Sequence, residues 1–144
     1  MGEFFAALIG AVVGAIIPFF ALRFNYRQLY AQTISNNRME WINVWRENVS
    51  KFLACAETLR NNGSCGSAEL LKLEKEMYEA RGMVVSRLNL SEEDHQLMLA
   101  LMKEFKIHCS DEDFCKNREA ILAMARKILK PEWERLKDEA RGKR

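Results

Sequence analysis

Residues 38–59 read RMEWINVWRENVSKFLACAETL, and this stretch decides the fold. Its apolar side chains recur every three or four residues, which is the period of an α-helix with one buried face. The apolar positions are Trp41, Ile42, Trp45, Val49, Phe52, Leu53, Ala56 and Leu59. We therefore expect a helix that packs this face against other parts of the chain.

Three more helices are expected on the C-terminal side. The loop over residues 61–66 (NNGSCG) ends the first helix, and polar capping residues precede each later apolar stripe. The expected boundaries are a helix over about 68–88 capped by Ser67, one that Ser91 opens and that runs to about Cys109, and one capped by Asp111 or Asp113 that Pro131 kinks or restarts. No stretch alternates in the way of a strand, so the fold class is all-α, a bundle of about four helices.

The later helices also carry apolar stripes that indicate a shared core. The expected core positions are Leu70, Leu73, Met77, Tyr78, Val84, Val85 and Leu88, then Leu97, Leu99, Leu101, Met102 and Phe105, then Phe114, Ile121, Leu122, Met124, Ile128, Leu129 and Leu136. The indoles of Trp41, Trp45 and Trp133 are also expected in the core. About 100 residues suffice for a stable core of this kind.

On the N-terminal side, residues 4–22 read FFAALIGAVVGAIIPFFAL and contain no charge. A helix of this length spans about 28 Å, close to the thickness of a bilayer's hydrocarbon core. We predict an uncleaved single-pass anchor that contacts membrane lipid. Arg23, Arg27 and Arg38 follow it, whereas only Glu3 precedes it, so the positive-inside rule puts the N-terminus outside and the bundle in the cytoplasm.

Small residues form two neighbouring stripes on this predicted span. The first consists of Ala6, Gly10 and Gly14, and the second of Ala7, Ala11 and Ala15. Small side chains let membrane helices approach closely, so we predict self-association through this face and a homo-oligomer. Pro18 removes a backbone hydrogen bond and predicts a kink near the cytoplasmic side.

The segment that joins the anchor to the bundle is predicted to be helical and stiff. Between Leu22 and Trp41 there is neither Pro nor Gly, and any break is expected at Ser35-Asn36-Asn37. The expected domain organisation is therefore a transmembrane anchor over 1–22, a juxtamembrane helix over 23–40 and a cytoplasmic helical bundle over 41–144.

Composition and motifs argue against most chemistries. Residues 23–144 hold 22 Lys and Arg against 19 Asp and Glu, a balance that speaks against nucleic-acid binding. The four cysteines lack the close pairs of a zinc site, and no nucleophile motif or phosphate-binding glycine loop is present. We predict no catalytic residue, no cofactor and no metal. His95 and His108 are the only histidines, and each is expected to have an ordinary structural role.

Three segments resemble signatures of a family of small bacterial proteins with one N-terminal span and a helical cytoplasmic domain. They are residues 35–42 (SNNRMEWI) with Arg46, residues 87–95 (RLNLSEEDH), and residues 128–137 (ILKPEWERLK). The residues that carry the resemblance are Arg38, Trp41, Arg46, Arg87, Asn89, His95 and Trp133. The best-known protein of similar architecture is the accessory membrane protein of type VI-B CRISPR systems, whose domain resembles HEPN domains.

The resemblance implies a homo-oligomeric inner-membrane effector or accessory protein of antiviral defence, which forms a pore or depolarises the membrane and has a defence-system protein as partner. Two alternatives stay open: a membrane-tethered adaptor that recruits a cytoplasmic partner, and a HEPN-like RNA-binding protein or RNase. HEPN ribonucleases carry Arg and His with four to six residues between them. Here seven residues separate Arg87 from His95, and Lys103 takes the Arg position relative to His108, so no RNase activity is expected.

Overall fold

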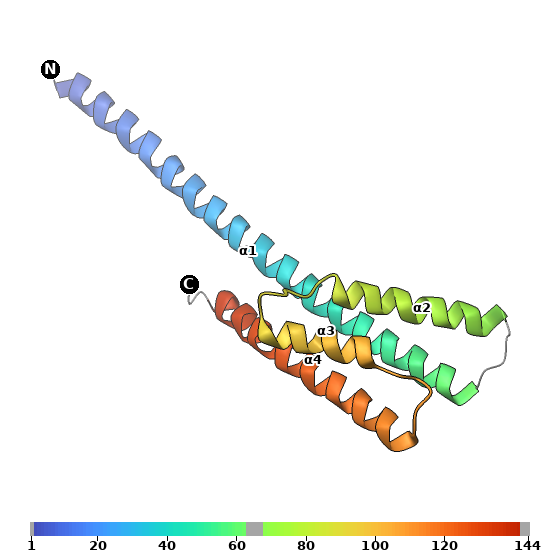
Figure 1. The fold of residues 1–144 in the computed structure, drawn as a ribbon. Helices are drawn as coiled ribbons and strands as arrows, with labels where there is room; N and C mark the ends of the chain where they lie inside the picture. Colours follow the sequence, from blue (N-terminus) through green and yellow to red (C-terminus); the bar gives the residue numbers. More distant parts are fainter. Residues whose placement is uncertain (1, 63–67, 142–144) are drawn as a thin grey trace. The chain divides into compact units, whose positions relative to one another are not determined.

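The computed structural model describes residues 2–62 and 68–141; of these, the side chains of residues 2–13, Ala15, Ile17 and Ala140 are not described. Its helices are α1 (Gly2–Asn62), α2 (Ala68–Val85), α3 (Glu93–Glu104) and α4 (Asp111–Ala140) (Figure 1). No strand occurs in these ranges. The predicted all-α bundle is therefore confirmed.

The chain divides into two compact units, residues 1–37 and residues 38–144. The sequence-based division placed this boundary between Glu40 and Trp41. The helical conformation of α1 continues through Ser35, Asn36 and Asn37, where a break was considered, and through Pro18.

Within the described residues, no helix has a segment that is both long and apolar enough to cross a membrane. Most side chains of the predicted span are not described, namely those of residues 4–13, Ala15 and Ile17.

Ion pairs at both ends of α4 define how α1 and α4 run in the second unit. Arg38 pairs with Glu139 and, at 3.1 Å, with Glu132 near the end of α4. Arg60, six helical turns further along α1, pairs with Asp111 at the start of α4. The two helices are therefore antiparallel. We call the two ends of the bundle the Arg38 end and the Arg60 end.

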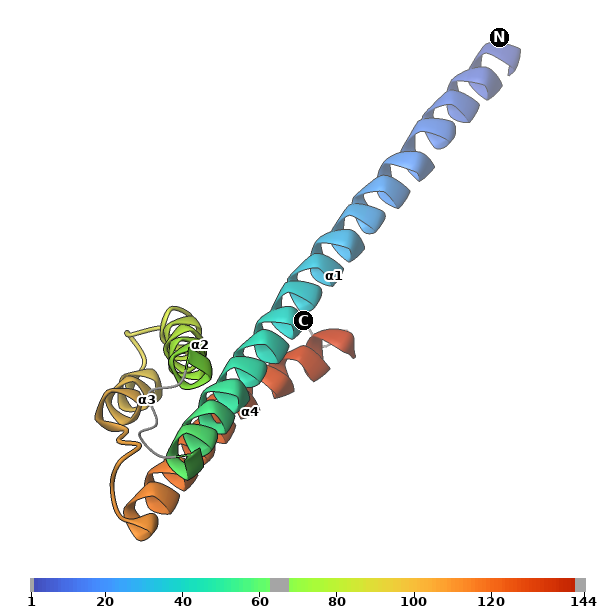
Figure 2. The same ribbon diagram turned by 90° about the vertical axis from the view of Figure 1, so that its right-hand side faces the viewer.

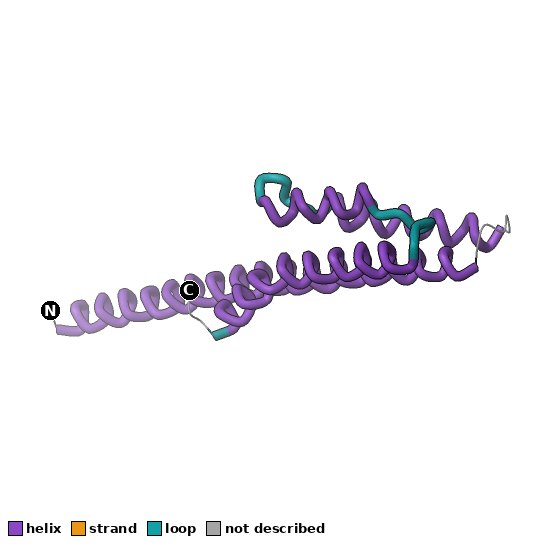
Figure 3. Tube along the Cα trace, turned by 60° about the horizontal axis from the view of Figure 1, so that its bottom comes forward, coloured by secondary structure: helices purple, strands orange, loops and turns teal. Residues whose placement is uncertain are grey.

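The other helices also alternate in direction. Lys51 of α1 pairs with Glu76 of α2 at 3.3 Å, and Trp45 of α1 donates to the carbonyl of Val84, later in α2. Lys127 of α4 pairs with Asp94 of α3. The arrangement is an up-down-up-down bundle, in which α1 with α4 and α2 with α3 form two layers (Figures 2 and 3).

One apolar core fills the space between these layers. The fully enclosed large side chains, each below 2% exposure, are Trp45, Phe52, Met98, Met102, Ile121 and Val84. Rings of Phe52, Phe105 and Phe114 meet edge to face, with centroids 5.1 and 5.5 Å apart, and join α1 to the α3–α4 connection and to α4. These positions all lie on the predicted apolar stripes, including Met102 and Phe105 on the stripe of the third helix, except that Met98 was not predicted.

Several predicted core positions are wrong. Trp133 is 41% exposed and Leu97 is 45% exposed, and Tyr78 also faces solvent. In α3 the apolar run is continuous from Leu97 to Met102 apart from Ala100, so its period does not indicate which side is buried. The helix instead buries His95, Met98 and Met102, which share one face at spacings of three and four.

Helix ends also differ from the predictions. Helix α2 ends at Val85, three residues early, because Arg87 and Leu88 form tighter turns whose N–H groups donate to carbonyls three residues back. The N-cap of α3 is Glu92 rather than Ser91, and α3 ends at Glu104 because Phe105 is extended and turns its ring into the core. The predicted cap Ser67 lies outside the described residues.

Helix α4 is capped one residue before Asp111, the first of the two expected caps. The N-cap is Ser110, whose hydroxyl accepts from the Asp113 N–H at 3.1 Å and donates to the Asp113 carboxylate at 2.7 Å. The bond from the Asp113 N–H to the Ser110 hydroxyl is an ordinary side-chain N-cap. The helix passes Pro131 and continues to Ala140, so it does not restart there.

Candidate functional site

The three family-like segments meet at the Arg38 end of the bundle. Residues 35–42 contribute Arg38, which holds the end of α4 through Glu132 and Glu139. The α2–α3 turn, which carries residues 87–95, lies at the same end, because Trp45 donates to the carbonyl of Val84 at 3.3 Å. Residues far apart in sequence therefore lie toward the same end of the bundle.

Arg38 is the centre of a half-buried charge cluster. Its guanidinium is 21% exposed and contacts two carboxylates of α4, which are themselves mostly covered. A guanidinium offers a fork of donors, so one arginine satisfies both partners. The cluster fixes the register of α1 against α4.

The tryptophans of this region have different environments. The Trp41 and Trp45 rings stack at 6.0 Å and 13°, and Trp45 is completely buried. Trp133 is exposed, with the Lys137 ammonium 5.8 Å from its ring centroid. Arg46 is exposed and donates to Asn43 on its own helix. Trp133 and Arg46 are thus not part of the core.

The α2–α3 turn is held by Asn89 and His95. The Asn89 N–H donates to Nδ1 of His95 at 2.7 Å, and His95 is 8% exposed. The Asn89 side chain accepts from the N–H and hydroxyl of Ser91 and donates to Glu92 at 2.8 Å. Nδ1 must be unprotonated to accept, so His95 is the Nε2–H tautomer in this turn. Its Nε2 lies 3.9 Å from Glu92.

Arg87 points to its own helix rather than to this network. Its guanidinium donates to the carbonyl of Met83 at 3.0 Å, at the end of α2. Arg87 and His95 flank the turn between α2 and α3 in the sequence. His95 holds the turn by a direct bond to Asn89, and Arg87 caps the preceding helix.

The predicted small-residue face is described at one position only. A Cβ added at Gly14 would meet nothing within 4 Å, so no contact inside the chain requires glycine there. Ala6, Ala7, Gly10, Ala11 and Ala15 lie outside the described side chains.

The first unit exposes large apolar side chains from Ile16 onward. They are Ile16, Phe19, Phe20, Leu22, Phe24, Tyr26, Leu29, Tyr30 and Ile34. Monomeric proteins rarely leave such a contiguous apolar surface in water, and it marks a site of contact with a membrane or a protein.

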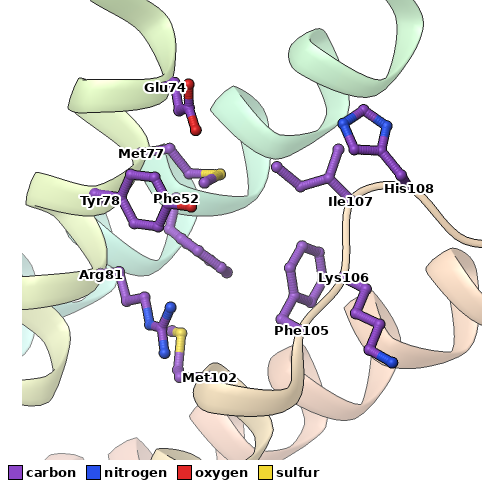
Figure 4. Close-up of a pocket in the computed structure, with 10 residues that line it drawn as sticks. All are labelled: Phe52, Glu74, Met77, Tyr78, Arg81, Met102, Phe105, Lys106, Ile107 and His108. Carbon is purple, nitrogen blue, oxygen red and sulfur yellow. The ribbon is translucent and has the colours of Figure 1, made fainter. Parts of the chain in front are cut away.

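The second unit contains a cavity of about 340 Å³ between α1, α2, the end of α3 and the α3–α4 connection (Figure 4). Its apolar walls come from Phe52, Met77, Met102, Phe105 and Ile107. Its polar lining consists of Glu74, Tyr78, Arg81, Lys106 and His108. None of these was a predicted site residue. They come from separate elements, and no local sequence pattern marks them.

The cysteines differ in exposure. Cys55 is buried, and burial, with a smaller effect of the Glu76 carboxylate, raises the pKa of its thiol, while Lys51 lowers it. Cys115 is exposed and Cys109 half-buried. Cys65 lies outside the described residues. Among the described residues, no cluster of three His, Cys, Asp or Glu side chains is placed to hold a metal ion.

Comparison of the chain with models of protein families, with curated proteins and with solved structures finds no match.

Proposed function

We propose that this chain is a homo-oligomeric effector of bacterial antiviral defence, anchored in the inner membrane by residues 4–22, with its bundle in the cytoplasm. The observation that carries the proposal is the exposed aromatic and aliphatic surface of α1 from Phe19 to Ile34, which begins within the uncharged run and continues beyond it. Aromatic rings favour the membrane interface, and Arg23 and Arg27 can extend to lipid headgroups.

Self-association of the anchor is supported by its small residues. Glycine in the middle of a helix costs about 0.5–1 kcal/mol relative to alanine. Gly14 has open space around it within the chain, so nothing inside the chain offsets that cost. Close approach of a second copy at the Gly10 and Gly14 face would offset it.

A role in assembly or binding, rather than in catalysis, fits the family-like residues. His95 is occupied by the Asn89 N–H, and Arg38 by two carboxylates. Both therefore have a structural role, because they stabilise the Arg38 end of the bundle.

The proposal is tested by measuring membrane potential in bacteria that express the chain, with and without phage infection. We expect depolarisation by the wild type and loss of depolarisation in a Gly10→Leu, Gly14→Leu double variant. Gly82→Leu is the matched control, because Gly82 of α2 also has open space around its Cβ position.

Other outcomes of this experiment identify the alternatives. A membrane-bound oligomer that never changes ion permeability would support the adaptor. RNA cleavage by the purified wild type that is lost in a folded His95→Ala variant would support a HEPN-like RNase.

Coupling between anchor and bundle is tested by inserting Gly-Gly-Ser after Gln32, within α1. A continuous helix transmits rotation, whereas a flexible insert does not. We expect the insertion to leave anchoring and folding intact and to abolish depolarisation. Depolarisation equal to that of the wild type would exclude mechanical coupling through α1.

A further inference from the structure

The cavity in the second unit has the size and walls of a small-molecule site. Its volume of about 340 Å³ is at the lower end of the range for ligand pockets. Met77 and Met102 lie with Phe52 and Phe105 around it. Phe52, Met77 and Met102 are buried behind the wall, and the half-buried Phe105 and Ile107 supply apolar surface that a ligand can reach.

Arg81 brings a positive charge without a partner to these walls. Its side chain is half-buried, and no described residue forms an ion pair or hydrogen bond with its guanidinium. Arg38 and Arg60, by contrast, each pair with a carboxylate of α4. A guanidinium beside apolar walls attracts an anion more strongly than one in open water, and it can hold a carboxylate by two parallel hydrogen bonds.

The charges that line the cavity are of opposite sign at its two ends, so they orient a charged ligand. Glu74 precedes Arg81 by two helical turns, about 10 Å along α2, so the two charges lie at different ends of the cavity. Figure 4 shows Glu74, Met77, Tyr78 and Arg81 along the α2 side, while the Lys106 side chain on the opposite side points away from them. An anion is therefore favoured at Arg81 and disfavoured at Glu74.

We propose that this cavity binds a small molecule that combines an apolar body with one carboxylate. The carboxylate lies on Arg81, and the apolar body lies against Phe105, Ile107 and the ring of Tyr78, the apolar lining groups that keep accessible surface. This site goes beyond the proposed function, since it requires neither the anchor nor self-association. It gives the bundle a means to respond to a metabolite.

The experiment uses three probes that share one apolar body and differ in charge: cinnamate, cinnamamide and cinnamylamine. Each is titrated by calorimetry into the full-length chain in nanodiscs of zwitterionic lipid, with empty nanodiscs as the blank. We expect cinnamate to bind about tenfold more tightly than cinnamamide, the gain typical of a charge-assisted hydrogen bond. Cinnamylamine should not bind measurably.

Substitutions on α2 then identify the anion site. Arg81→Gln should weaken cinnamate binding about tenfold, and Glu74→Gln should tighten it about twofold, because it removes a repelling charge. Lys75→Gln is the control, because Lys75 is exposed on the same helix, pairs with Glu79 and does not line the cavity. This variant should bind cinnamate with the affinity of the wild type.

The proposal is overturned if no probe binds, if cinnamamide binds as tightly as cinnamate, or if Arg81→Gln leaves the affinity unchanged while its thermal unfolding matches the wild type. These results are separate from the membrane assay. Depolarisation without cinnamate binding rejects only the ligand site, and binding without depolarisation rejects only the effector.

Discussion

The two units of the chain differ in whether their large apolar side chains are buried or exposed. In residues 38–144 the large apolar groups meet around one core, with Trp45, Met98 and Ile121 fully enclosed. In the first unit, Phe20 and Leu29 are among many that stay exposed. Helix formation satisfies backbone hydrogen bonds in both units, but only the second also buries enough apolar surface to stabilise a fold by itself.

Truncating one large side chain in each unit gives the strongest test of this difference between the units. Met98→Ala should lower the free energy of unfolding of the bundle by about 2–5 kcal/mol, because it opens a cavity in the core. Phe20→Ala should change it by less than about 0.5 kcal/mol. All three tryptophans lie at or after residue 41, so urea denaturation followed by tryptophan fluorescence reports on the bundle alone.

Equal effects of these two substitutions would show that the first unit contributes to the stability of the bundle. The exposed side chains of α1 would then have partners within the chain, and the contrast between the units would be wrong.

The α2–α3 turn provides the next largest effect. His95→Ala leaves the Asn89 N–H without its acceptor, and we expect a loss of about 1–3 kcal/mol of unfolding free energy. Gln96→Ala, which removes an exposed bond to the Leu90 carbonyl, serves as the control and should cost less. If His95→Ala is as stable as the wild type, the bond to Asn89 does not hold the turn.

A smaller loss is expected where the two units join. Arg38→Met leaves Glu132 and Glu139 without their shared cation and should cost about 1–2 kcal/mol, between the values for exposed and buried pairs. Added salt should reduce the difference only slightly, since the cluster is partly covered. A loss that disappears completely in high salt would place the cluster in open solvent.

The smallest expected effect on stability comes from replacing one glycine in each unit, Gly14 and Gly82, by alanine. Gly82→Ala should stabilise the bundle by about 0.5–1 kcal/mol, because alanine favours the helix and has room there. Gly14→Ala should leave the stability of the bundle unchanged and weaken self-association of the chain in detergent. Urea denaturation measures the stability of both variants, and sedimentation measures the size of their oligomers. An unchanged oligomer in the Gly14 variant would remove the small-residue face from the proposal.

The sequence predicts most of this fold because the stripes of α1, α2 and α4 have a clear helical period. Trp45, Val84 and Ile121 were all expected in the core and are buried there. Helix α3 was misread because its leucines follow one another too closely for a period to be seen. Its buried face became visible only when His95 and Met98 were placed against the other helices.

The sites were less predictable than the helices. The bond from Asn89 to His95 depends on the conformation of a turn that no capping rule describes, since the expected cap Ser91 bonds to Asn89 instead. The cavity needs α2 and the α3–α4 connection to face each other, so Arg81 and Phe105 have no relation that a local pattern could show.

The antiparallel pairing of α1 with α4 has a consequence for synthesis on the ribosome. Arg38 and Glu139 are separated by 101 residues, so the partner of the first bundle helix is made last. At roughly 5–20 residues per second, that interval is about 5–20 seconds. During this time α2 and α3 can cover part of the Trp45 face, but the face that meets α4 has no partner. Nascent chains of this protein therefore offer a chaperone one apolar helix face for several seconds before the bundle closes.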